Sequence, residues 1–289
     1  MSTAAITKNS RYTLNNGRTI PITGFGVYQT PASKATTLVY EALKVGYRHI
    51  DSARIYQNEE ESVAGIAQFL KEFPDVKRED IFYTTKIWNE EQGYETTKIA
   101  IESSLERAKD IQYIDLFLIH SSLTNKEKRL GTYKALQEAV ATGKVKSIGV
   151  SNYGTHHLDE LFAWEGLTIK PVVNQVELHP WLPRKDLQEY AKKHDFYLEA
   201  YTPLTQGQKF DDPELVAIAK KHGYSVVEVL LRWSYDQGFI PLAKTATVAR
   251  IKPNFDVLDH VVLDAEDLKI LDKPDSYEVL TWDPTKYEG

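Results

Sequence analysis

The chain has 289 residues, a formal net charge of −6, 42% hydrophobic residues and 26% charged residues. This is the composition of a soluble globular protein with a large core, and it excludes wholesale disorder. The negative charge disfavours nucleic acid and anionic membranes as general partners. Because cysteine is absent, disulfides, thiolate nucleophiles, iron–sulfur clusters and cysteine-rich zinc sites are excluded.

The N-terminal region predicts a short hairpin and no targeting segment. Residues 1–18 contain no apolar stretch typical of a secretory signal, and no run of about 18 apolar residues is present to span a membrane. We therefore expect a cytoplasmic protein without a membrane partner. In residues 9–20 an Asn-Gly turn joins two short β-prone runs, which indicates a hairpin ahead of the main fold.

Strands and helices are predicted to alternate along the rest of the chain. Apolar or β-branched runs predict eight strands, at 22–28, 47–51, 81–86, 114–120, 145–151, 171–177, 196–201 and 239–242. Apolar residues at helical spacing predict helices at 33–46, 58–73, 97–108, 132–141, 155–164, 185–194, 213–222 and 225–236. The charged residues 126–129 are expected to be a solvated helix start. The aperiodic aromatic tail 272–289 is expected to be a surface strap or part of a pocket wall.

This alternation is typical of βα units and a parallel sheet, which can close into a barrel or remain open and doubly wound. The open fold would favour a G-x-G-x-x-G motif after the first strand. The best candidate, Gly24-Phe25-Gly26, lacks the third glycine and lies inside the predicted strand. The strand count and spacing favour an eight-stranded α/β barrel. Because no linker divides the chain, we expect a single domain over residues 1–289.

Polar residues end most of the predicted strands. In a barrel the carboxyl ends of the strands form the active-site face. The polar residues at or just after the predicted strand ends are Asp51, Lys86, His120, Ser151, Asn152, Asn174, Gln175, Glu177, Tyr201 and Lys244. Any one of them alone is more often structural, but a purely structural barrel has no need of such a ring. We therefore predict a functional site at this rim.

Several motifs at these strand ends resemble the aldo-keto reductase family. The segment 46–53 (GYRHIDSA), followed by 56–59 (YQNE), is similar to the signature of the family. The other similar segments are Lys86, 118–120 (LIH), 149–153 (GVSNY), 174–180 (NQVELHP), 201–204 (YTPL) and 244–254 with its Lys-Thr, Arg-Ile and Asn. The likeness extends from about residue 12 into the tail. It is greatest to fungal NADPH-dependent carbonyl reductases.

This resemblance implies a (β/α)8 TIM barrel that uses NADPH to reduce aldehydes and ketones to alcohols. It also implies a catalytic tetrad of Asp51, Tyr56, Lys86 and His120. Tyr56 would donate the proton, and a nearby Lys86 ammonium would lower the phenol pKa from its unperturbed value of about 10. Asp51 would be the counter-charge of the lysine. His120 would hydrogen-bond the substrate oxygen or join a proton relay.

The resemblance also assigns cofactor contacts. Ser151, Asn152 and Gln175 would bind the nicotinamide carboxamide, Tyr201 would stack on the ring, and Leu204 would join this site. Lys244, Thr245 and Arg250 would bind the 2′-phosphate, and Asn254 would bind the adenine edge. For Gln175 and Asn174 an interior polar network is the alternative. This late segment departs from the family pattern, since residues 240–245 are two residues longer and Pro253 stands where an acidic residue is frequent, and Ser121-Ser122 is a second departure.

The substrate site is expected to be roomy. The small pair Ser121-Ser122 beside His120 predicts space for bulky ketones such as keto esters. Tyr28, Trp88 and Trp282 are expected to form aromatic walls of this site, and Ser122 is also expected to line it. Trp282 could instead lie flat on the barrel as a packing anchor for the tail.

Other functions stay open at this stage. A cofactor-binding regulatory protein on the same fold and a phosphosugar-processing barrel enzyme are the alternatives. The eight histidines show no metal-ligand spacing, and no G-x-x-x-x-G-K-[ST] motif is present, so neither a metal site nor ATP chemistry is expected. We expect a small-molecule carbonyl substrate and a monomer or weak homodimer.

Overall fold

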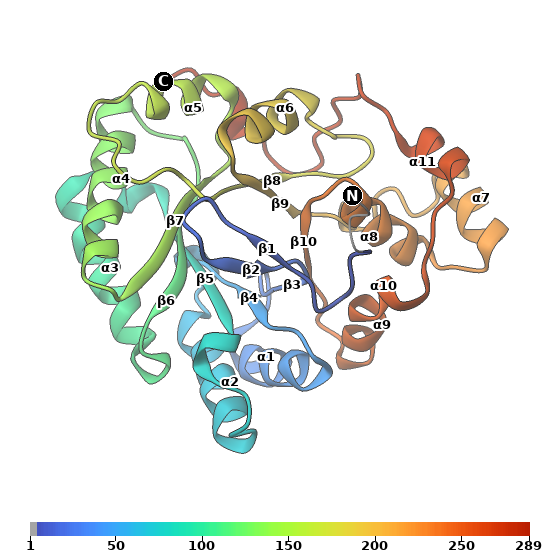
Figure 1. The fold of residues 1–289 in the computed structure, drawn as a ribbon, viewed down its shortest axis with the longest axis horizontal. Coiled ribbons are helices and arrows are strands. Elements are labelled where there is room, and N and C mark those ends of the chain that lie inside the picture. Colours follow the sequence, from blue (N-terminus) through green and yellow to red (C-terminus); the bar gives the residue numbers. More distant parts are fainter. Residues whose placement is uncertain (1–4) are drawn as a thin grey trace.

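The computed structural model describes residues 5–289 and shows eight parallel strands closed into a barrel and surrounded by helices (Figure 1). Residues 1–4 lie outside the described residues. They are the start of the expected domain 1–289 and of residues 1–18, in which no secretory signal is expected. The strands follow the order β10-β3-β4-β5-β6-β7-β8-β9 around the barrel. Their bounds are β3 Gly24–Gly26, β4 His49–Asp51, β5 Phe82–Ile87, β6 Ile114–Ile119, β7 Val145–Ser151, β8 Val173–Glu177, β9 Tyr197–Tyr201 and β10 Ile240–Ala243. The predicted α/β barrel is confirmed.

All eight predicted strands are present, and all but β7 have shifted ends. The largest difference is in the first, predicted over 22–28 and observed only at Gly24–Gly26. This strand packs closely against β10, since a Cβ at Gly24 would collide with the side chain of Leu242. A larger residue at position 24 would therefore force the Leu242 side chain to move.

The helices form the outer layer (Figure 1). Their bounds are α1 Ala32–Val45, α2 Glu59–Glu72, α3 Tyr94–Arg107, α4 Lys126–Ala141, α5 Thr155–Phe162, α6 Lys185–His194, α7 Pro213–His222, α8 Val226–Asp236, α9 Ile251–Phe255, α10 Val257–His260 and α11 Ala265–Leu271. The last three were missed because they are too short to show a helical period. The helix start at 126–129 is confirmed, but its expected solvation is wrong for Arg129, which is buried and pairs with Glu160 of α5 at 2.8 Å.

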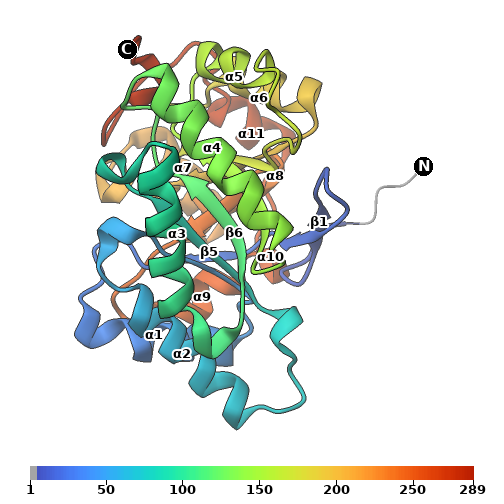
Figure 2. The same cartoon turned by 90° about the vertical axis from the view of Figure 1, so that its left-hand side faces the viewer.

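The predicted hairpin, β1 Arg11–Thr13 with β2 Thr19–Pro21, covers the N-terminal end of the barrel. The Asn15 amide donates to the carbonyl oxygens of Pro171 and Asp195, at 2.9 and 2.8 Å, just before β8 and β9. The Tyr12 ring stacks on Tyr197 with 4.7 Å between centroids. Figure 2 shows the hairpin projecting from one side of the molecule, away from the C-terminus. The opposite end of the barrel is thus left for a site.

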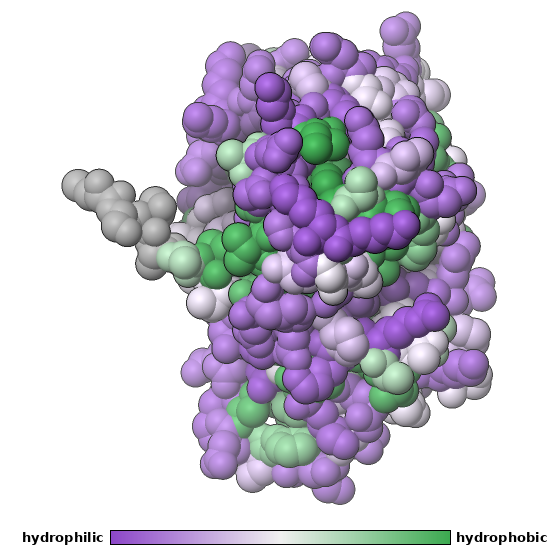
Figure 3. All heavy atoms as spheres, turned by 90° about the vertical axis from the view of Figure 1, so that its right-hand side faces the viewer, coloured by the Kyte–Doolittle hydropathy of each residue, from purple (hydrophilic) through white to green (hydrophobic). Residues whose placement is uncertain are grey.

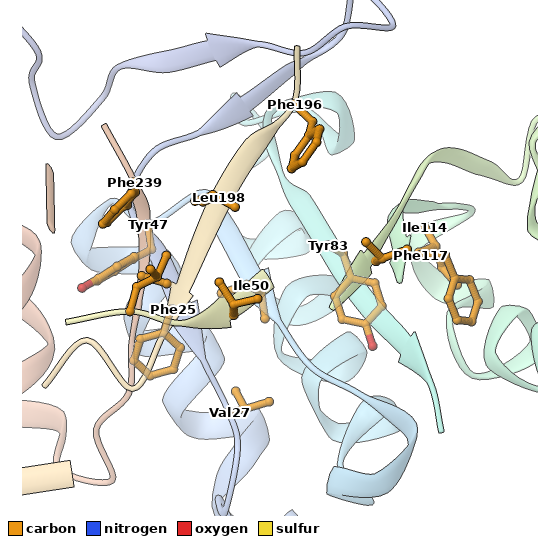
Figure 4. Close-up of a cluster of buried hydrophobic side chains, with 14 of the residues drawn as sticks. Phe25, Val27, Tyr47, Ile50, Tyr83, Ile114, Phe117, Phe196, Leu198 and Phe239 are labelled. Atoms are coloured by element: carbon orange, nitrogen blue, oxygen red, sulfur yellow. The ribbon is translucent and has the colours of Figure 1, made fainter. Parts of the chain in front are cut away.

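Alternation along the strands divides the core into two parts. On β6, Leu116 and Leu118 belong to a cluster inside the barrel, whereas Phe117 and Ile119 pack under the helices. Figure 4 shows part of the larger cluster, with rings such as Phe25 and Phe117. The face bearing α7 and α11 is mainly hydrophilic, with apolar residues in separate patches (Figure 3). Among residues 5–289, no helix is long and apolar enough to cross a membrane.

Candidate active site

A fully buried lysine lies at the centre of the cluster at the carboxyl ends of β4 and β5. The Lys86 ammonium donates to both carboxylate oxygens of Asp51, at 2.7 and 2.9 Å, and to the carbonyl oxygen of Ser52 at 2.8 Å. It also donates to the Tyr56 hydroxyl at 3.2 Å. Buried charges need such compensation. Because neighbouring strands supply Asp51 and Lys86, the parallel register brings the pair together.

The Tyr56 phenol does not titrate as predicted. Burial raises its pKa well above the ordinary value of 10, and the charge of Asp51 and the Tyr28 phenol raise it further. The expectation of a Tyr56 pKa lowered by Lys86 is therefore wrong. The physical reason is that the Asp51 carboxylate offsets the lysine charge while the phenol is desolvated. Tyr56 is thus held protonated, which is the form that can donate a proton.

The loop that carries this phenol is fixed by a buried asparagine. The 3₁₀ turn Arg54–Tyr56 follows β4. The Asn58 amide donates to the carbonyl oxygens of Val27 and Thr30, at 2.9 and 3.0 Å, and its oxygen accepts from the Ser52 hydroxyl at 2.9 Å. Asn58 was not singled out from the sequence because an asparagine before a helix is usually an ordinary N-cap.

A neutral imidazole lies beside the phenol. His120 follows β6 and is 7% exposed, and the centroid of its ring is 5.7 Å from that of Tyr56. Burial, together with the charge of Lys86, holds the His120 pKa well below 6.5. Its Nδ1 atom has no hydrogen-bond partner among the described residues. The structure therefore brings all four predicted catalytic residues together, with the histidine in its neutral form.

The residues expected to hold the nicotinamide carboxamide already bond one another. Asn152 donates to the His120 carbonyl oxygen at 2.9 Å and accepts from the Tyr201 hydroxyl at 2.7 Å. The Ser151 hydroxyl donates to the backbone oxygen of Gln175 at 2.7 Å. These bonds connect β7, β8 and β9 at the rim and fix the orientation of the side chains. The assignment of Ser151, Asn152 and Tyr201 to the cofactor stays a prediction.

Gln175 takes part in an interior polar network, the alternative considered for it. Its amide nitrogen donates to Asp51 and to Glu199, both at 2.9 Å. Only its oxygen is left for a carboxamide. Asn174 donates to the backbone oxygen of Tyr153 at 2.9 Å. Glu199 was not singled out from the sequence. Its position two residues from both Tyr197 and Tyr201 on β9 could have placed its side chain on the same face of the strand as theirs.

Three of the expected wall residues surround the catalytic cluster. The Tyr28 ring, half exposed, lies 5.0 Å from that of Tyr56. Trp88 lies 5.0 Å from His120, and Trp282 lies 6.1 Å from Trp88 and 6.4 Å from His120, all between ring centroids. The tail therefore reaches the site, which supports Trp282 as a wall rather than a distant packing anchor.

Ser122 does not line an open pocket, and the expectation that it binds substrate is corrected. It is fully buried, and its hydroxyl donates to the carbonyl oxygen of Pro284 at 2.7 Å. Ser121 is also buried and donates to Asn89 at 2.6 Å. The C-terminal tail covers the space that these small side chains leave beside His120.

Two buried charged residues hold the tail in place. Glu177, at the end of β8, accepts from the backbone nitrogens of Leu280 and Thr281, at 2.7 and 3.2 Å, and from the Thr281 hydroxyl. Arg184 donates to Asp283 at 3.1 Å. Trp282 lies between these anchors in the sequence. Their role was missed because it depends on contacts about 100 residues apart in the chain.

The residues expected to bind the adenosine phosphate lie beyond β10. Lys244 is half-buried and Arg250 is exposed, and within residues 5–289 neither pairs with a carboxylate. Thr245 is buried, and its hydroxyl takes part in a local turn. Leu204 is half-buried and Asn254 is buried. Two unpaired cations close in sequence suit a phosphate dianion.

The site is therefore one in which a buried ion pair orients a protonated phenol next to a neutral imidazole, and comparisons agree with the chemistry this permits. A model of the aldo/keto reductase family matches residues 22–275. An uncharacterized oxidoreductase of Saccharomyces cerevisiae is 46% identical over 275 residues, covering 95% of this chain and 97% of its own. A glyoxal reductase of Bacillus subtilis is 45% identical over 260 residues, 90% of either chain.

A solved structure gives the same result. The crystal structure of an aldo/keto reductase from Brucella melitensis matches with a TM-score of 0.84 and 42% identity, covering 92% of this chain and 99% of that one. The chain therefore belongs to the aldo/keto reductase family. Members of this family are oxidoreductases that generally act on the carbonyl groups of small molecules and use nicotinamide cofactors.

Proposed function

We propose that the protein is an NADPH-dependent reductase of aldehydes and ketones, including bulky keto esters, with Tyr56 as the proton donor. The observation that carries the proposal is the Lys86 ammonium, which contacts Asp51 at 2.7 Å and Tyr56 at 3.2 Å in a buried cluster. We further propose a cytoplasmic monomer or weak homodimer, which cell fractionation and size-exclusion chromatography would test.

In this proposal each side chain of the cluster has its own part in the reduction. When bound, the reduced nicotinamide supplies the hydride for the carbonyl carbon. Lys86 donates to the Tyr56 oxygen, so the phenolic proton is free to point at a ligand. As negative charge builds on the carbonyl oxygen, Tyr56 delivers this proton, and Lys86 stabilises the phenolate that remains. His120 donates a hydrogen bond to the same oxygen.

The choice of NADPH rests on Lys244 and Arg250. Charge-assisted contacts of these residues with a 2′-phosphate would favour NADPH over NADH. The proposal of bulky substrates now rests on the walls formed by Tyr28, Trp88 and Trp282, since Ser122 is covered. Aromatic walls around a few polar groups are typical of sites for large, mainly apolar ligands.

The test is consumption of NADPH by the purified protein with a panel of aldehydes, small ketones and keto esters. We expect turnover with NADPH, much slower turnover with NADH, and activity on the keto esters. Tight NADPH binding without turnover of any carbonyl would instead favour the regulatory alternative. Turnover with NADH as fast as with NADPH would contradict the cofactor assignment.

A further inference from the structure

A second carboxyl group, that of Glu199, lies inside the barrel next to the proposed catalytic cluster. Glu199, in the middle of β9, is fully buried. Its Oε2 accepts from the Gln175 amide nitrogen at 2.9 Å, and the same nitrogen donates to Asp51 Oδ2 at 2.9 Å. One amide group thus bridges Glu199 to the partner of Lys86. The proton transfer described above makes no use of Glu199.

The other oxygen of Glu199 faces a buried histidine. Glu199 Oε1 has no hydrogen-bond partner among residues 5–289 and lies 3.5 Å from Nε2 of His49. His49 Nδ1 lies 3.3 Å from the carbonyl oxygen of Pro21, which can only accept, so a proton belongs on Nδ1. Nε2 is then an acceptor. The Thr84 hydroxyl, at 3.3 Å, can donate to it, and so can Glu199 when its carboxyl group is protonated.

The charges around Glu199 favour its protonated form. The titratable groups that face it are His49 and Asp51 on β4 and Lys86 on β5, with the neutral Gln175 on β8. The neighbouring strand β10, Ile240–Ala243, is apolar. Because Asp51 already balances Lys86, a second carboxylate would be an uncompensated charge in the barrel interior.

The expected titration agrees with this geometry. Burial raises the pKa of Glu199 to about 8, and the charge of Asp51 raises it too, against hydrogen bonding by Gln175 and the charge of Lys86. Burial lowers the pKa of His49 to about 3, so the imidazole stays neutral. At neutral pH Glu199 is therefore expected to be a carboxylic acid next to the Lys86–Asp51 ion pair.

We propose that Glu199 is a positioning residue that, as a carboxylic acid between His49 and Gln175, holds Asp51 and Lys86 in the arrangement that serves Tyr56, and that its ionisation switches the site off. The inference rests on the proposed function. Ionised Glu199 adds a negative charge facing Lys86, which makes a phenolate at Tyr56 costlier and the phenol a poorer acid. Carbonyl reduction therefore declines as Glu199 loses its proton.

The experiment is the pH profile of kcat/KM for NADPH-dependent carbonyl reduction in wild type, Glu199→Gln and Glu199→Met. In wild type we expect a decline above pH about 8, approaching tenfold per pH unit. Glu199→Gln keeps an acceptor for Gln175 and, through its amide N–H, a donor toward His49 in place of the carboxyl proton. It should retain activity within about threefold at pH 7 and lose the alkaline decline. Glu199→Met should be slower at pH 7 and also lack the decline.

Asp115→Asn is the matched control, because Asp115 is a buried carboxyl whose pKa burial also raises, but it pairs with Arg78 away from the cluster. It should keep the wild-type profile. A decline that persists unchanged in both Glu199 variants belongs to another group, such as Tyr56, and overturns the proposal. A wild-type profile that is flat through pH 9.5 also overturns it.

A readout without turnover separates this inference from the proposed function. Infrared difference spectra between wild type and Glu199→Gln, recorded without cofactor, should show a protonated carboxyl band at pH 7 that is lost by pH 9.5. Absence of the band at pH 7 overturns the inference even if the protein reduces ketones. Its presence in a protein that reduces no carbonyl supports the protonation of Glu199 and refutes the proposed function alone.

Discussion

At the scale of single residues, the cluster shows how one ammonium can serve two purposes. Lys86 has three N–H groups, which reach the Asp51 carboxylate, the Ser52 carbonyl oxygen and the Tyr56 hydroxyl. The first two contacts fix the ammonium and offset its charge. The third orients the phenol while its proton stays available. This contact marks Tyr56 as the proposed proton donor, since no other tyrosine hydroxyl among residues 5–289 bonds to Lys86.

Replacing Tyr56 by phenylalanine should remove proton donation and little else. We expect kcat to fall by about 10²-fold or more, the scale of lost general acid catalysis, with the affinity for NADPH nearly unchanged. Steady-state kinetics and a fluorescence titration with NADPH measure the two effects. Tyr28→Phe, which changes a half-exposed phenol 5.0 Å away, is the control. Near-normal turnover of Tyr56→Phe would remove the residue from this role.

Replacing Lys244 by alanine should weaken NADPH binding far more than NADH binding. The lost charge-assisted contact with a 2′-phosphate corresponds to about 1.5–3 kcal/mol, or roughly 10- to 150-fold in Kd. Isothermal titration with both cofactors measures it. Lys252→Ala, an exposed lysine of α9 that pairs with Asp256, is the matched control and should change neither affinity. Equal weakening of both cofactors would refute the phosphate assignment.

At the scale of elements, the C-terminal tail is a strap whose two ends are tied to the barrel and whose middle reaches the site. Glu177 holds the segment before Trp282, and Arg184 holds Asp283 after it. Burial alone would raise the pKa of Glu177, but hydrogen bonds from His179, Thr281 and Leu280 keep it below its ordinary 4.5. Glu177 is thus a carboxylate at neutral pH, suited to accept several donors.

Because the tail places Trp282 next to Trp88 and His120, we predict that Trp282 affects the selectivity of the enzyme for substrates of different size. Trp282→Ala should change the ratio of kcat/KM between bulky and small ketones several-fold, because the wall next to Trp88 and His120 is removed. Affinity for NADPH should change little. Trp164→Ala, a tryptophan after α5, is the control and should leave the ratio unchanged. A uniform effect of Trp282→Ala on all substrates would show that this residue does not shape the pocket.

Glu177→Gln should loosen the strap. A neutral amide accepts more weakly, and losing about 2 kcal/mol of charge-assisted bonding should speed amide hydrogen exchange at Leu280 and Thr281 about 30-fold at pH 7. Because the pKa of folded Glu177 lies below its unfolded value, its contribution is complete above pH 4.5 and disappears as the pH falls through the folded value. Unchanged exchange at these two amides would contradict the role of the carboxylate.

At the scale of the whole molecule, the N-terminal hairpin and the proposed active site lie at opposite ends of the barrel. The N-terminal hairpin closes one end by contacts with residues that precede the strands, and the proposed site occupies the end where the strands finish. Between them lies an interior layer of apolar side chains, among them Leu116 and Leu118. Changes at the hairpin should therefore affect folding and leave turnover intact.

Asn15→Ala tests this separation. The carbonyl oxygens of Pro171 and Asp195 would lose their donor, and at about 0.5–1.5 kcal/mol for each hydrogen bond we expect the free energy of unfolding to fall by about 1–3 kcal/mol. Urea unfolding measures the loss, and kcat/KM at 25 °C should stay within about twofold. Asn9→Ala, an exposed asparagine just before the hairpin, should change neither quantity. A large loss of activity in folded Asn15→Ala protein would show that the two ends are coupled.

The sequence by itself determined the order of strands and helices and the rim where the polar residues gather. Local signals suffice for this, because alternating periods of two and 3.6 residues are properties of short segments and a parallel barrel must put all its strand ends on one rim. Asp51, Lys86 and His120 therefore could be grouped before any coordinates. The short helices α9 to α11 could not be predicted, and the ends of the three-residue β3 were misplaced, because too few residues carry a period.

Only the tertiary structure decided which groups share a proton or a partner. The pKa of Tyr56 depends on burial and on how Asp51 offsets Lys86, which no spacing reveals. The bridge from Asp51 through Gln175 to Glu199 crosses the barrel between residues up to 124 positions apart, and the tail covers Ser122 from 162 positions away. Such contacts arise because closure of the barrel turns every second side chain of distant strands toward one small volume, where desolvation favours pairing between polar groups.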